Sequence, residues 1–302
     1  MPEAYVRDLT SFQKAHEHFI GIDSDGCAFD SMEIKHKECF IPNTVRHFGL
    51  QAISRYTREA AEFVNLYSKW RGINRFPALA LTFDFLAERP EVRTRGVAVP
   101  RLEAMRDWLT HETTPGNPAL EAQIQAAESS AAAELRSVLT WSRAVNATIA
   151  DIVHGVPPFP FVRDCLQKAS ERADIMVVSA TPFEALQREW RENDIARYAA
   201  LIAGQEMGTK TEQLRAASEG KYGSDRVLVI GDAPSDMQAA RANDALFYPI
   251  NPGAEAESWG RLLAEALDKF FAGKYQARYE AALVADFQAR LPDTPPWRQE
   301  RA

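Results

Sequence analysis

The sequence has few cysteines, no long apolar run and no excess of positive charge. Its three cysteines, Cys27, Cys39 and Cys165, include no Cys-x-x-Cys pair, and an odd number fits a reducing compartment better than a disulfide framework. Residues 1–8 lack the apolar stretch of a signal peptide and no run approaches a membrane span, so we expect a cytoplasmic protein that does not enter a membrane. The net charge of −7 argues against a general affinity for nucleic acid.

The apolar residues that are present form short, continuous runs. With 302 residues and 46% hydrophobic content, the chain can bury a sizeable core in one large domain or two smaller ones. The runs predict parallel strands covered on both faces, at 19–22, 175–178, 227–230, 246–250 and, more weakly, 199–203. Helical patterns follow at 182–192, 211–219 and 236–243. This succession predicts an α/β fold, a Rossmann-like doubly wound parallel sheet that binds ligands outside the carboxyl ends of its strands.

The interval between the first two strands is unusually long. It runs over residues 24–178, whereas an ordinary βαβ unit takes about 30 residues. Helical patterns fill most of it, at 53–70, 77–88, 100–110 and, in an alanine-rich stretch, 118–152. We therefore predict an all-helical cap domain of residues 33–154, inserted after the first strand. The catalytic core would comprise residues 1–32 and 155–302, with the C-terminal helices docked on it.

Two carboxylates and a glycine directly follow the first strand. From the strand end, Asp23 could attack a phosphoryl group and form an aspartyl-phosphate. Asp25 lies on the same side of locally extended backbone and could protonate the leaving oxygen, then deprotonate the hydrolytic water. Gly26 permits the tight turn that brings backbone amides toward a phosphate. Taken alone, the segment is equally compatible with an ordinary Asp-Gly turn or a calcium-type loop.

A second pair of carboxylates follows the strand expected at 227–230. Asp232 stands at its end, and Asp236 lies four residues further on. Carboxylate oxygens are ligands that Mg²⁺ prefers, so Asp232 is placed to bind it, with Asp236 as a further ligand or an anchor. The helix dipole alone would favour an acidic residue at Asp236, but it does not explain Asp232.

Candidate phosphate-binding groups occur at two further places. Ser179 ends the strand at 175–178, and Thr181-Pro182-Phe183-Glu184 resembles a capping box, so we assign Thr181 to the helix cap and the Ser179 hydroxyl to a phosphate oxygen. A generic turn serine is the alternative. Lys210 precedes a predicted helix, where a cation opposes the dipole, and locally broken rules tend to mark functional sites. We prefer it to Lys221, which lies in a glycine-flanked turn.

Taken in order, these residues resemble the four motifs of the haloacid dehalogenase-like hydrolase superfamily: Asp23-x-Asp25-Gly26, Ser179, Lys210 and Gly231-Asp232-x-x-x-Asp236. The position of the insert is similar to that of the helical cap type in this superfamily. Two features depart from the pattern. Cys27-Ala28 replaces the usual Thr-Leu, which removes a hydroxyl that often supports the loop, and the insert is longer than an ordinary helical cap.

The resemblance implies a role for each motif residue. Asp23 would be the nucleophile, Asp25 the acid/base, and Lys210 a catalytic cation. Ser179 and Gly26 would contribute to phosphate binding. The implied cofactor is Mg²⁺, in a site formed by Asp23, Asp25, Asp232 and Asp236.

The predicted function is hydrolysis of a small phosphate monoester, because Asp25 favours phosphoester chemistry over dehalogenation or phosphonate cleavage. A phosphomutase would use the same carboxylates and is the alternative; a catalytically silent binding protein is disfavoured because no core motif residue is missing. In the basic, aromatic segment at 69–77, we expect Arg75 or Arg71 to contact an anionic group of a small phosphorylated metabolite, unless this is only a solvated loop. The sequence indicates no oligomeric state.

Overall fold

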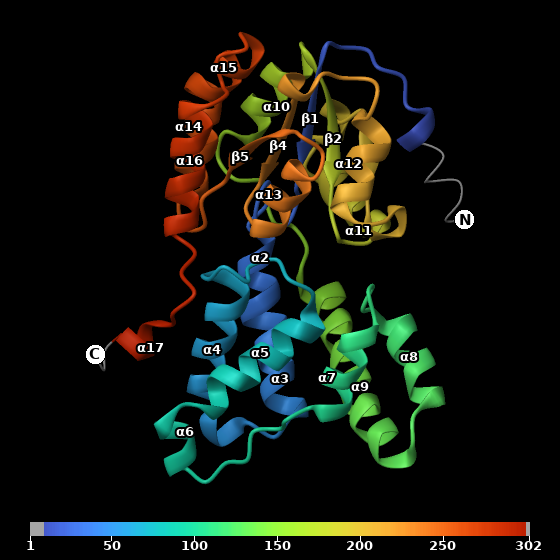
Figure 1. Cartoon of the computed structure of the whole chain (residues 1–302), viewed down its shortest axis with the longest axis vertical. Coiled ribbons are helices and arrows are strands. Elements are labelled where there is room, and N and C mark those ends of the chain that lie inside the picture. The colour runs from blue at the N-terminus through green and yellow to red at the C-terminus, as the bar shows by residue number, and fades with distance from the viewer. Residues whose placement is uncertain (1–8, 300–302) are drawn as a thin grey trace. The chain divides into compact units, whose positions relative to one another are not determined.

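The computed structural model describes residues 9–299, which divide into two compact units. One unit comprises residues 9–32 and 155–291 and contains the sheet; the other comprises residues 33–154 and 292–299 and is helical (Figure 1). The predictions for residues 1–8, including the absence of a signal peptide, and the assignment of residues 300–302 to the core lie outside the described residues.

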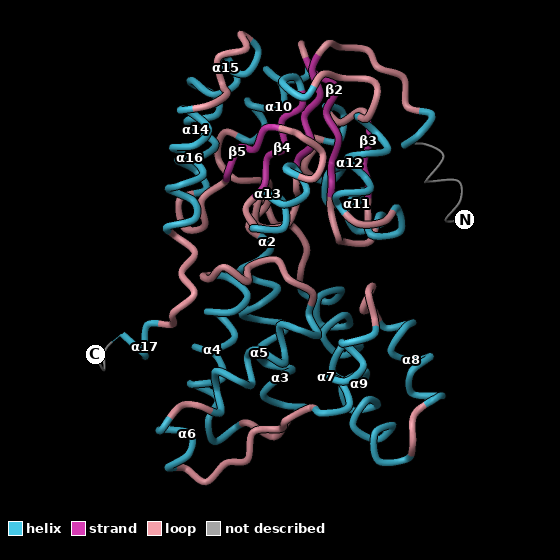
Figure 2. Tube along the Cα trace, in the orientation of Figure 1, coloured by secondary structure: helices cyan, strands magenta, loops and turns pink. Residues whose placement is uncertain are grey.

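The first unit is built on a five-stranded parallel sheet with the strand order β3-β2-β1-β4-β5 (Figure 2). The strands are β1 (His18–Ile22), β2 (Ala173–Val178), β3 (Leu201–Ala203), β4 (Val227–Gly231) and β5 (Leu246–Pro249). Ile22, the last residue of β1, lies opposite Val177 on one side and Ile230 on the other. The central strand therefore ends within one residue of both neighbours, and the predicted α/β fold class is confirmed.

Helices cover both faces of this sheet. Alternate residues of β1 belong to different cores, with Ile20 on one face and Phe19 on the other. The Ile20 face is covered by α10 (Val162–Ser170), α11 (Phe183–Glu192), α14 (Glu255–Arg261) and α15 (Leu267–Phe271). The Phe19 face is covered by α12 (Lys210–Ser218) and α13 (Pro234–Arg241). Burial on both faces explains why the strands are continuous apolar runs in the sequence.

The outer edge of β5 is covered by α16 (Arg278–Ala289). The backbone N–H of Phe247 in β5 donates to the Glu280 carboxylate at 2.9 Å, and the Tyr275 hydroxyl donates to the Phe247 carbonyl at 2.7 Å. These bonds satisfy edge groups that would otherwise be open to pairing with another chain. This C-terminal helix thus packs on the sheet.

The second unit contains the long insert, and the residues described between 33 and 154 form helices joined by short loops. Its helices run from α2 (Ser31–Ile34), which begins in the first unit, through α3 (Ile41–His47), α4 (Ser54–Leu66), α5 (Arg75–Ala87), α6 (Pro90–Thr94), α7 (Glu103–His111), α8 (Asn117–Ala126) and α9 (Ser129–Ile152). The alanine-rich stretch, expected as a single run, is broken at Ala127 and Glu128, which adopt extended backbone. The break lets α8 pack against α9 and bury Leu120 and Ile124.

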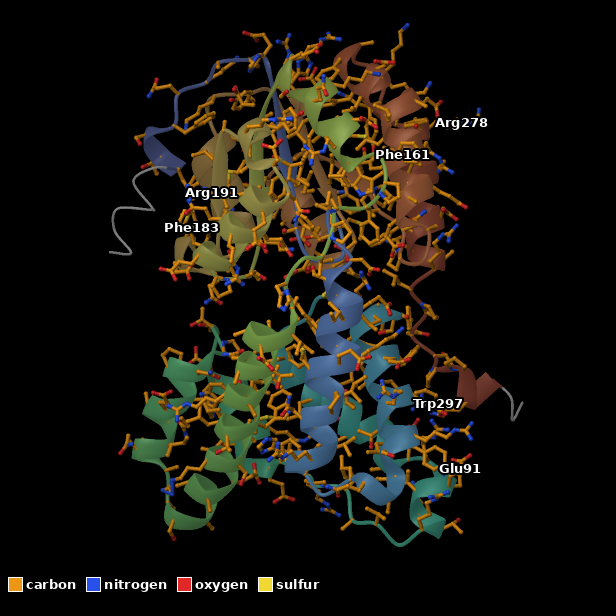
Figure 3. The ribbon with its side chains drawn as sticks, turned by 180° about the vertical axis from the view of Figure 1, so that it is seen from behind. Glu91, Phe161, Phe183, Arg191, Arg278 and Trp297 are labelled. Atoms are coloured by element: carbon orange, nitrogen blue, oxygen red, sulfur yellow. The ribbon has the colours of Figure 1, made fainter. Side chains whose placement is uncertain are left out.

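The last described helix, α17 (Pro296–Gln299), belongs to the helical unit, whereas the sequence prediction placed it on the core. The Trp297 ring (labelled in Figure 3) packs edge-on against Phe63 and Phe85. The guanidinium of Arg89 lies 4.6 Å from the centre of the same ring. Aromatic and cation–π contacts of this kind fix the position of α17, and the one-dimensional sequence does not reveal them.

The structure bears on two expectations from composition, one about the cysteines and one about membrane-spanning helices. Cys27, Cys39 and Cys165 are buried free thiols, so no disulfide joins them, and burial raises the pKa of Cys39 to about 11 and that of Cys165 to about 12. Within residues 9–299, no helix has both the length and the apolar character needed to cross a bilayer.

Asp174 in β2 anchors the segment that leads into the central strand. Its carboxylate is 4% exposed and accepts hydrogen bonds from the Tyr222 hydroxyl at 2.7 Å and from the backbone N–H groups of Ala15 and His16 at 3.0 and 2.9 Å. Burial opposes its ionisation, but the hydrogen bonds outweigh burial and lower the pKa of Asp174 below its ordinary value.

We expect Asp174→Asn to lower the free energy of unfolding by about 1–3 kcal/mol at pH 7, because an amide cannot replace a carboxylate as the acceptor of these bonds. A depressed folded-state pKa stabilises the fold above the unfolded value of about 3.9, and this stabilisation is lost as the pH falls through the folded pKa. The deficit of the variant should therefore shrink below about pH 4. Urea unfolding across pH 2–7 measures it, with exposed Asp225→Asn as the matched control; a deficit independent of pH would contradict the assignment.

Candidate active site

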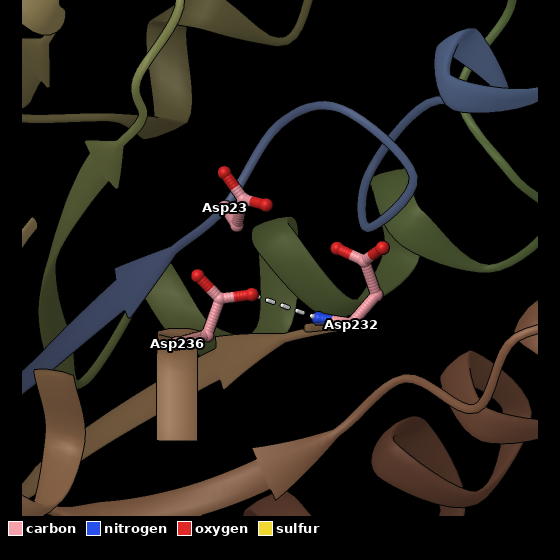
Figure 4. A group of neighbouring side chains, drawn as sticks. All are labelled: Asp23, Asp232 and Asp236. Carbon is pink, nitrogen blue, oxygen red and sulfur yellow. Dashed lines mark hydrogen bonds between the residues drawn. The ribbon is translucent and has the colours of Figure 1, made fainter. Parts of the chain in front are cut away.

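Three buried carboxylates meet at the carboxyl ends of the neighbouring strands β1 and β4 (Figure 4). Asp23 directly follows β1, and its backbone N–H donates to the carbonyl of Ile230 in β4 at 3.0 Å. Asp232 directly follows β4, and Asp236 lies in the first turn of α13. One ligand atom from each of Asp23, Asp232 and Asp236 lies within 4.8 Å of the others. The structure thus brings together residues that are separated by more than two-thirds of the chain.

Gly231 at the end of β4 allows α13 to approach this closely. A Cβ at Gly231 would lie 2.3 Å from the Cβ of Asp236 and 2.5 Å from its Cγ, so any side chain would displace the carboxylate. The Asp236 Oδ2 accepts hydrogen bonds from the N–H groups of Asp232 at 3.1 Å and Ala233 at 3.0 Å; Figure 4 draws the first of these. Asp236 therefore caps its own helix and also fixes the backbone that carries Asp232.

Lys210 is the first residue of α12, which begins at a capping box formed by Thr209 and Glu212. Its Nζ lies 2.9 Å from Oδ1 of Asp23 and 2.6 Å from Oδ1 of Asp236. Burial disfavours the ammonium, but the two carboxylates outweigh it and raise the pKa of Lys210 above its ordinary value, so the cation stays charged. Lys221, the competing lysine, instead donates to the carbonyl of Leu9 at 3.4 Å.

The carboxylate cluster carries more negative charge than Lys210 balances. Burial raises the pKa of Asp23 well above its ordinary value, Asp236 and Asp232 add to the effect, and Lys210 opposes it. One lysine against three buried carboxylates leaves the ionised cluster two charges short of neutrality. A divalent cation would supply that charge, and hard oxygen donors are the ligands that Mg²⁺ prefers. The residues present therefore fit the predicted cofactor.

Asp25 stands apart from this cluster. Its carboxylate accepts a hydrogen bond from the Ser31 hydroxyl on Oδ1 and one from the Thr181 hydroxyl on Oδ2, the latter at 2.6 Å. Within residues 9–299, the Asp25 side chain does not belong to the group of three carboxylates that could hold a metal ion. The sequence prediction had included Asp25 in the metal site. Of the predicted metal residues, Asp23, Asp232 and Asp236 are the ones whose carboxylates come together.

The assignment of Thr181 to a helix cap is wrong. The N-cap position of α11 is Pro182, no side chain caps it, and the N–H of Phe183 donates to Glu206 at 3.0 Å. The hydroxyl of Thr181 goes to Asp25 because a bond to a carboxylate is stronger than one between neutral groups. Sequence spacing alone could not reveal this partner, which lies 156 positions away.

Ser179 follows β2 and is 2% exposed. Its Oγ accepts a hydrogen bond from the N–H of Thr181 at 3.2 Å, and its carbonyl accepts one from the amide of Gln213 at 3.1 Å. Gln213, which the sequence analysis missed, also donates to the carbonyls of Gly204 and Gly208, both at 2.9 Å. Through these hydrogen bonds Gln213 connects the loops after β2 and β3 to α12. Its only sequence signal is weak: it lies three residues after Lys210, on the same helix face.

The loop after β1 is supported without the threonine that the family pattern favours. Gly26 has φ +77°, and its N–H donates to the carbonyl of Phe29 at 2.8 Å, so this glycine supplies the turn while its own amide is occupied. Cys27 is buried with its Sγ 3.6 Å from the carbonyl of Ile230. Ser24 provides further support, because its Oγ accepts from the Trp190 indole at 2.9 Å.

Arg75 and Arg71 both form hydrogen bonds within the helical unit. Nη1 of Arg75 donates to the Ser142 hydroxyl at 3.1 Å and to Asn146 Oδ1 at 2.6 Å, and burial lowers the pKa of Arg75 to about 10. Arg71 is 3% exposed, and its Nη1 donates to the carbonyl of Leu66 at 2.9 Å. Contact of either arginine with a substrate stays a prediction.

A cavity of about 460 Å³ lies elsewhere in the first unit, against β3 and α11. Phe183 and Arg191, both labelled in Figure 3, line it together with Gln187. Among its described lining residues there is none of the three clustered carboxylates. The cavity is therefore separate from the candidate active site.

No protein-family model matches this chain, and no curated protein matches it. Among solved structures it is similar to a haloacid dehalogenase-like hydrolase from Streptococcus pneumoniae, with 15% identity and a TM-score of 0.40 over 80% of this chain and 90% of that one. It is also similar to a subfamily IA hydrolase from Geobacter sulfurreducens (16% identity, TM-score 0.39, 78% of this chain and 89% of that one). A third is a haloacid dehalogenase-like hydrolase from Xanthomonas campestris (12% identity, TM-score 0.41, 85% and 97%). Likenesses at this level of identity and TM-score bear on neither the reaction nor the substrate of this chain.

Proposed function

We propose that this protein is a Mg²⁺-dependent phosphatase that hydrolyses a small phosphate monoester through an aspartyl-phosphate on Asp23. The observation that carries the proposal is the buried cluster of Asp23, Asp232 and Asp236 around Lys210, at the carboxyl ends of parallel strands. Asp25, two residues after Asp23, supplies the second carboxylate that such a reaction needs.

In the first step, a carboxylate oxygen of Asp23 attacks phosphorus and the bond from phosphorus to the ester oxygen breaks. Asp25, in its protonated form, gives its proton to the departing oxygen. In the second step, ionised Asp25 takes a proton from water, whose oxygen attacks phosphorus while the bond to Asp23 breaks. Inorganic phosphate leaves, Asp23 is a carboxylate again, and Asp25 is again protonated.

The other site residues bind and orient the phosphoryl group. Lys210 holds positive charge beside Asp23, and the Ser179 hydroxyl lies at the end of the adjacent strand. Asp23, Asp232 and Asp236 would hold Mg²⁺, which would offset the charge of these carboxylates and of the phosphoryl oxygens. Asp236 also keeps Lys210 in place through their 2.6 Å contact.

The proposal is tested by phosphate release from a panel of metabolite phosphates and a generic aryl phosphate. We expect release with Mg²⁺, its loss in excess chelator, and its return when Mg²⁺ is restored, because the cluster needs a cation to bring an anionic substrate close. Mg²⁺ should also raise the unfolding temperature by relieving repulsion among the carboxylates. Release that persists in chelator would contradict the metal requirement. A sugar phosphate that is isomerised with no phosphate released would instead assign the alternative, a phosphomutase.

A further inference from the structure

We propose that Thr181 is a positioning residue for Asp25, holding the acid/base carboxylate through its hydroxyl during both steps of the reaction. The inference rests on the proposed phosphatase function and extends it to a residue that none of the four motifs includes. Thr181 touches Asp25 directly, since its Oγ1 donates to Asp25 Oδ2 at 2.6 Å.

The backbone of Thr181 is fixed on both sides of that hydroxyl. Its N–H donates to the Ser179 Oγ at 3.2 Å, and its carbonyl accepts a hydrogen bond from the N–H of Gln205 at 3.0 Å. Thr181 is thereby joined to the ends of both β2 and β3. The hydroxyl reaches Asp25 from a loop tied to the sheet, which makes it a suitable reference point for orienting a side chain.

Two hydroxyls from separate segments therefore help to orient the Asp25 carboxylate. Ser31 contacts Oδ1 from the start of α2, and Thr181 contacts Oδ2 from the loop before α11. Because the two donors approach different oxygens, rotation of the carboxylate would break at least one bond. Ser31 comes from the same chain segment as Asp25, so of these two donors Thr181 is the one that links the Asp25 carboxylate to the loop of Ser179.

A hydroxyl suits this task for a chemical reason. Asp25 must accept hydrogen bonds when it is ionised and donate one when it carries the proton. A neutral hydroxyl can donate to a carboxyl oxygen in either state and leaves the proton of Asp25 available to the leaving oxygen, whereas a neighbouring ammonium would hold Asp25 in its ionised form. Thr181 can therefore stay bonded to Asp25 while the proton moves to the leaving group and back.

A purely structural role for Thr181 would give a different kinetic result. A well-placed acid matters most when the leaving oxygen is strongly basic, as in an alkyl phosphate, and little for a nitrophenyl phosphate, whose leaving group departs without a proton. Loss of fold or of general rigidity would affect both esters alike. The ratio of the two rates therefore isolates the positioning of Asp25.

The test compares Thr181→Val, which keeps the shape and removes the hydroxyl, with Thr181→Ser, which keeps the hydroxyl. We measure kcat/KM for an alkyl phosphate and for p-nitrophenyl phosphate, because this constant reports on steps up to departure of the leaving group. We expect Thr181→Val to lose about 10–100-fold on the alkyl ester and less than about threefold on the nitrophenyl ester. Thr181→Ser should restore the alkyl-ester rate to within about threefold of the wild type.

The possible outcomes separate this inference from the proposed function. Equal loss on both esters, or no loss on either, would overturn the role of Thr181 while wild-type hydrolysis still supported the phosphatase. A wild-type protein that hydrolyses neither ester nor any metabolite phosphate would overturn both. Thermal unfolding confirms that each variant is folded. Should Thr181→Val fail to fold, Thr181→Ala is compared with Thr181→Ser by the same ratio.

Discussion

Asp23→Asn is expected to reduce phosphate release by about 10⁴-fold or more, because it removes the nucleophile on which the intermediate forms. The amide is nearly the same size as the carboxylate, so the fold should persist. We expect stability without Mg²⁺ to stay the same or to rise, because burial and the neighbouring carboxylates raise the pKa of Asp23 and so destabilise its ionised form relative to the neutral one. Loss of activity together with retained stability separates a chemical role from a structural one.

The matched control for this variant is Asp244→Asn. Asp244 is exposed, lies after α13 in the same unit and has φ +51°, a conformation that asparagine tolerates well. Phosphate release and urea unfolding are measured for both variants with and without Mg²⁺. Hydrolysis by Asp23→Asn at more than about a hundredth of the wild-type rate would remove Asp23 as the nucleophile.

Lys210→Met is expected to lower both the rate of hydrolysis and the stability of the fold. Lys221→Met should have a much smaller effect on each. The ammonium of Lys210 lies between Asp23 and Asp236, and its removal leaves two buried carboxylates without their cation. Breaking a buried ion pair by removing one partner typically destabilises a protein by about 3–5 kcal/mol. The same change removes the positive charge that faces the phosphoryl group, for which we expect a loss of about 10³-fold in kcat/KM.

Lys221 is a suitable control because it is also a lysine near α12, but among residues 9–299 its hydrogen bonds go to the backbone carbonyls of Leu9 and Ala216. Its replacement should lower the free energy of unfolding by about 1 kcal/mol or less and leave hydrolysis unchanged.

The double variant Asp23→Asn/Lys210→Met should be more stable than Lys210→Met alone, because the two side chains are in contact and their effects are then not additive. Equal effects of the two lysine variants on activity would contradict the assignment of Lys210. Urea unfolding and steady-state kinetics provide both measurements.

Two polar side chains of the site have hydrogen-bond partners that local sequence patterns could not predict. Thr181 has the local signature of a helix cap, but a carboxylate more than 150 positions away in the chain takes its hydroxyl. Gln213 looks like an ordinary helix residue, but it is fully buried and bonded to three carbonyls in the loops after β2 and β3. In both cases the partner comes from another strand end. Hydrogen bonds between distant segments leave no periodic pattern in a sequence, so local spacing cannot predict them.

Two features of the helical unit could likewise not be predicted from local sequence. The alanine-rich stretch favours helix throughout, and local propensity gives no reason for the break at Ala127 and Glu128; packing of α8 on α9 supplies one. The position of α17 depends in the same way on Trp297 meeting Phe63, Phe85 and Arg89. Side-chain packing between segments far apart in the chain decided both features.

The sequence by itself determined the parallel sheet, because strands buried on both faces are apolar at nearly every position. It also placed Asp23, Ser179 and Asp232 at strand ends, since each directly follows an apolar run. The tertiary structure alone decided which of these groups meet. Register and helix packing bring Lys210 and Asp236 to Asp23, and they direct Thr181 to Asp25. The physical reason is that a strand end is a local property of the chain, whereas the charge balance and hydrogen bonds of a buried site depend on several strand ends at once.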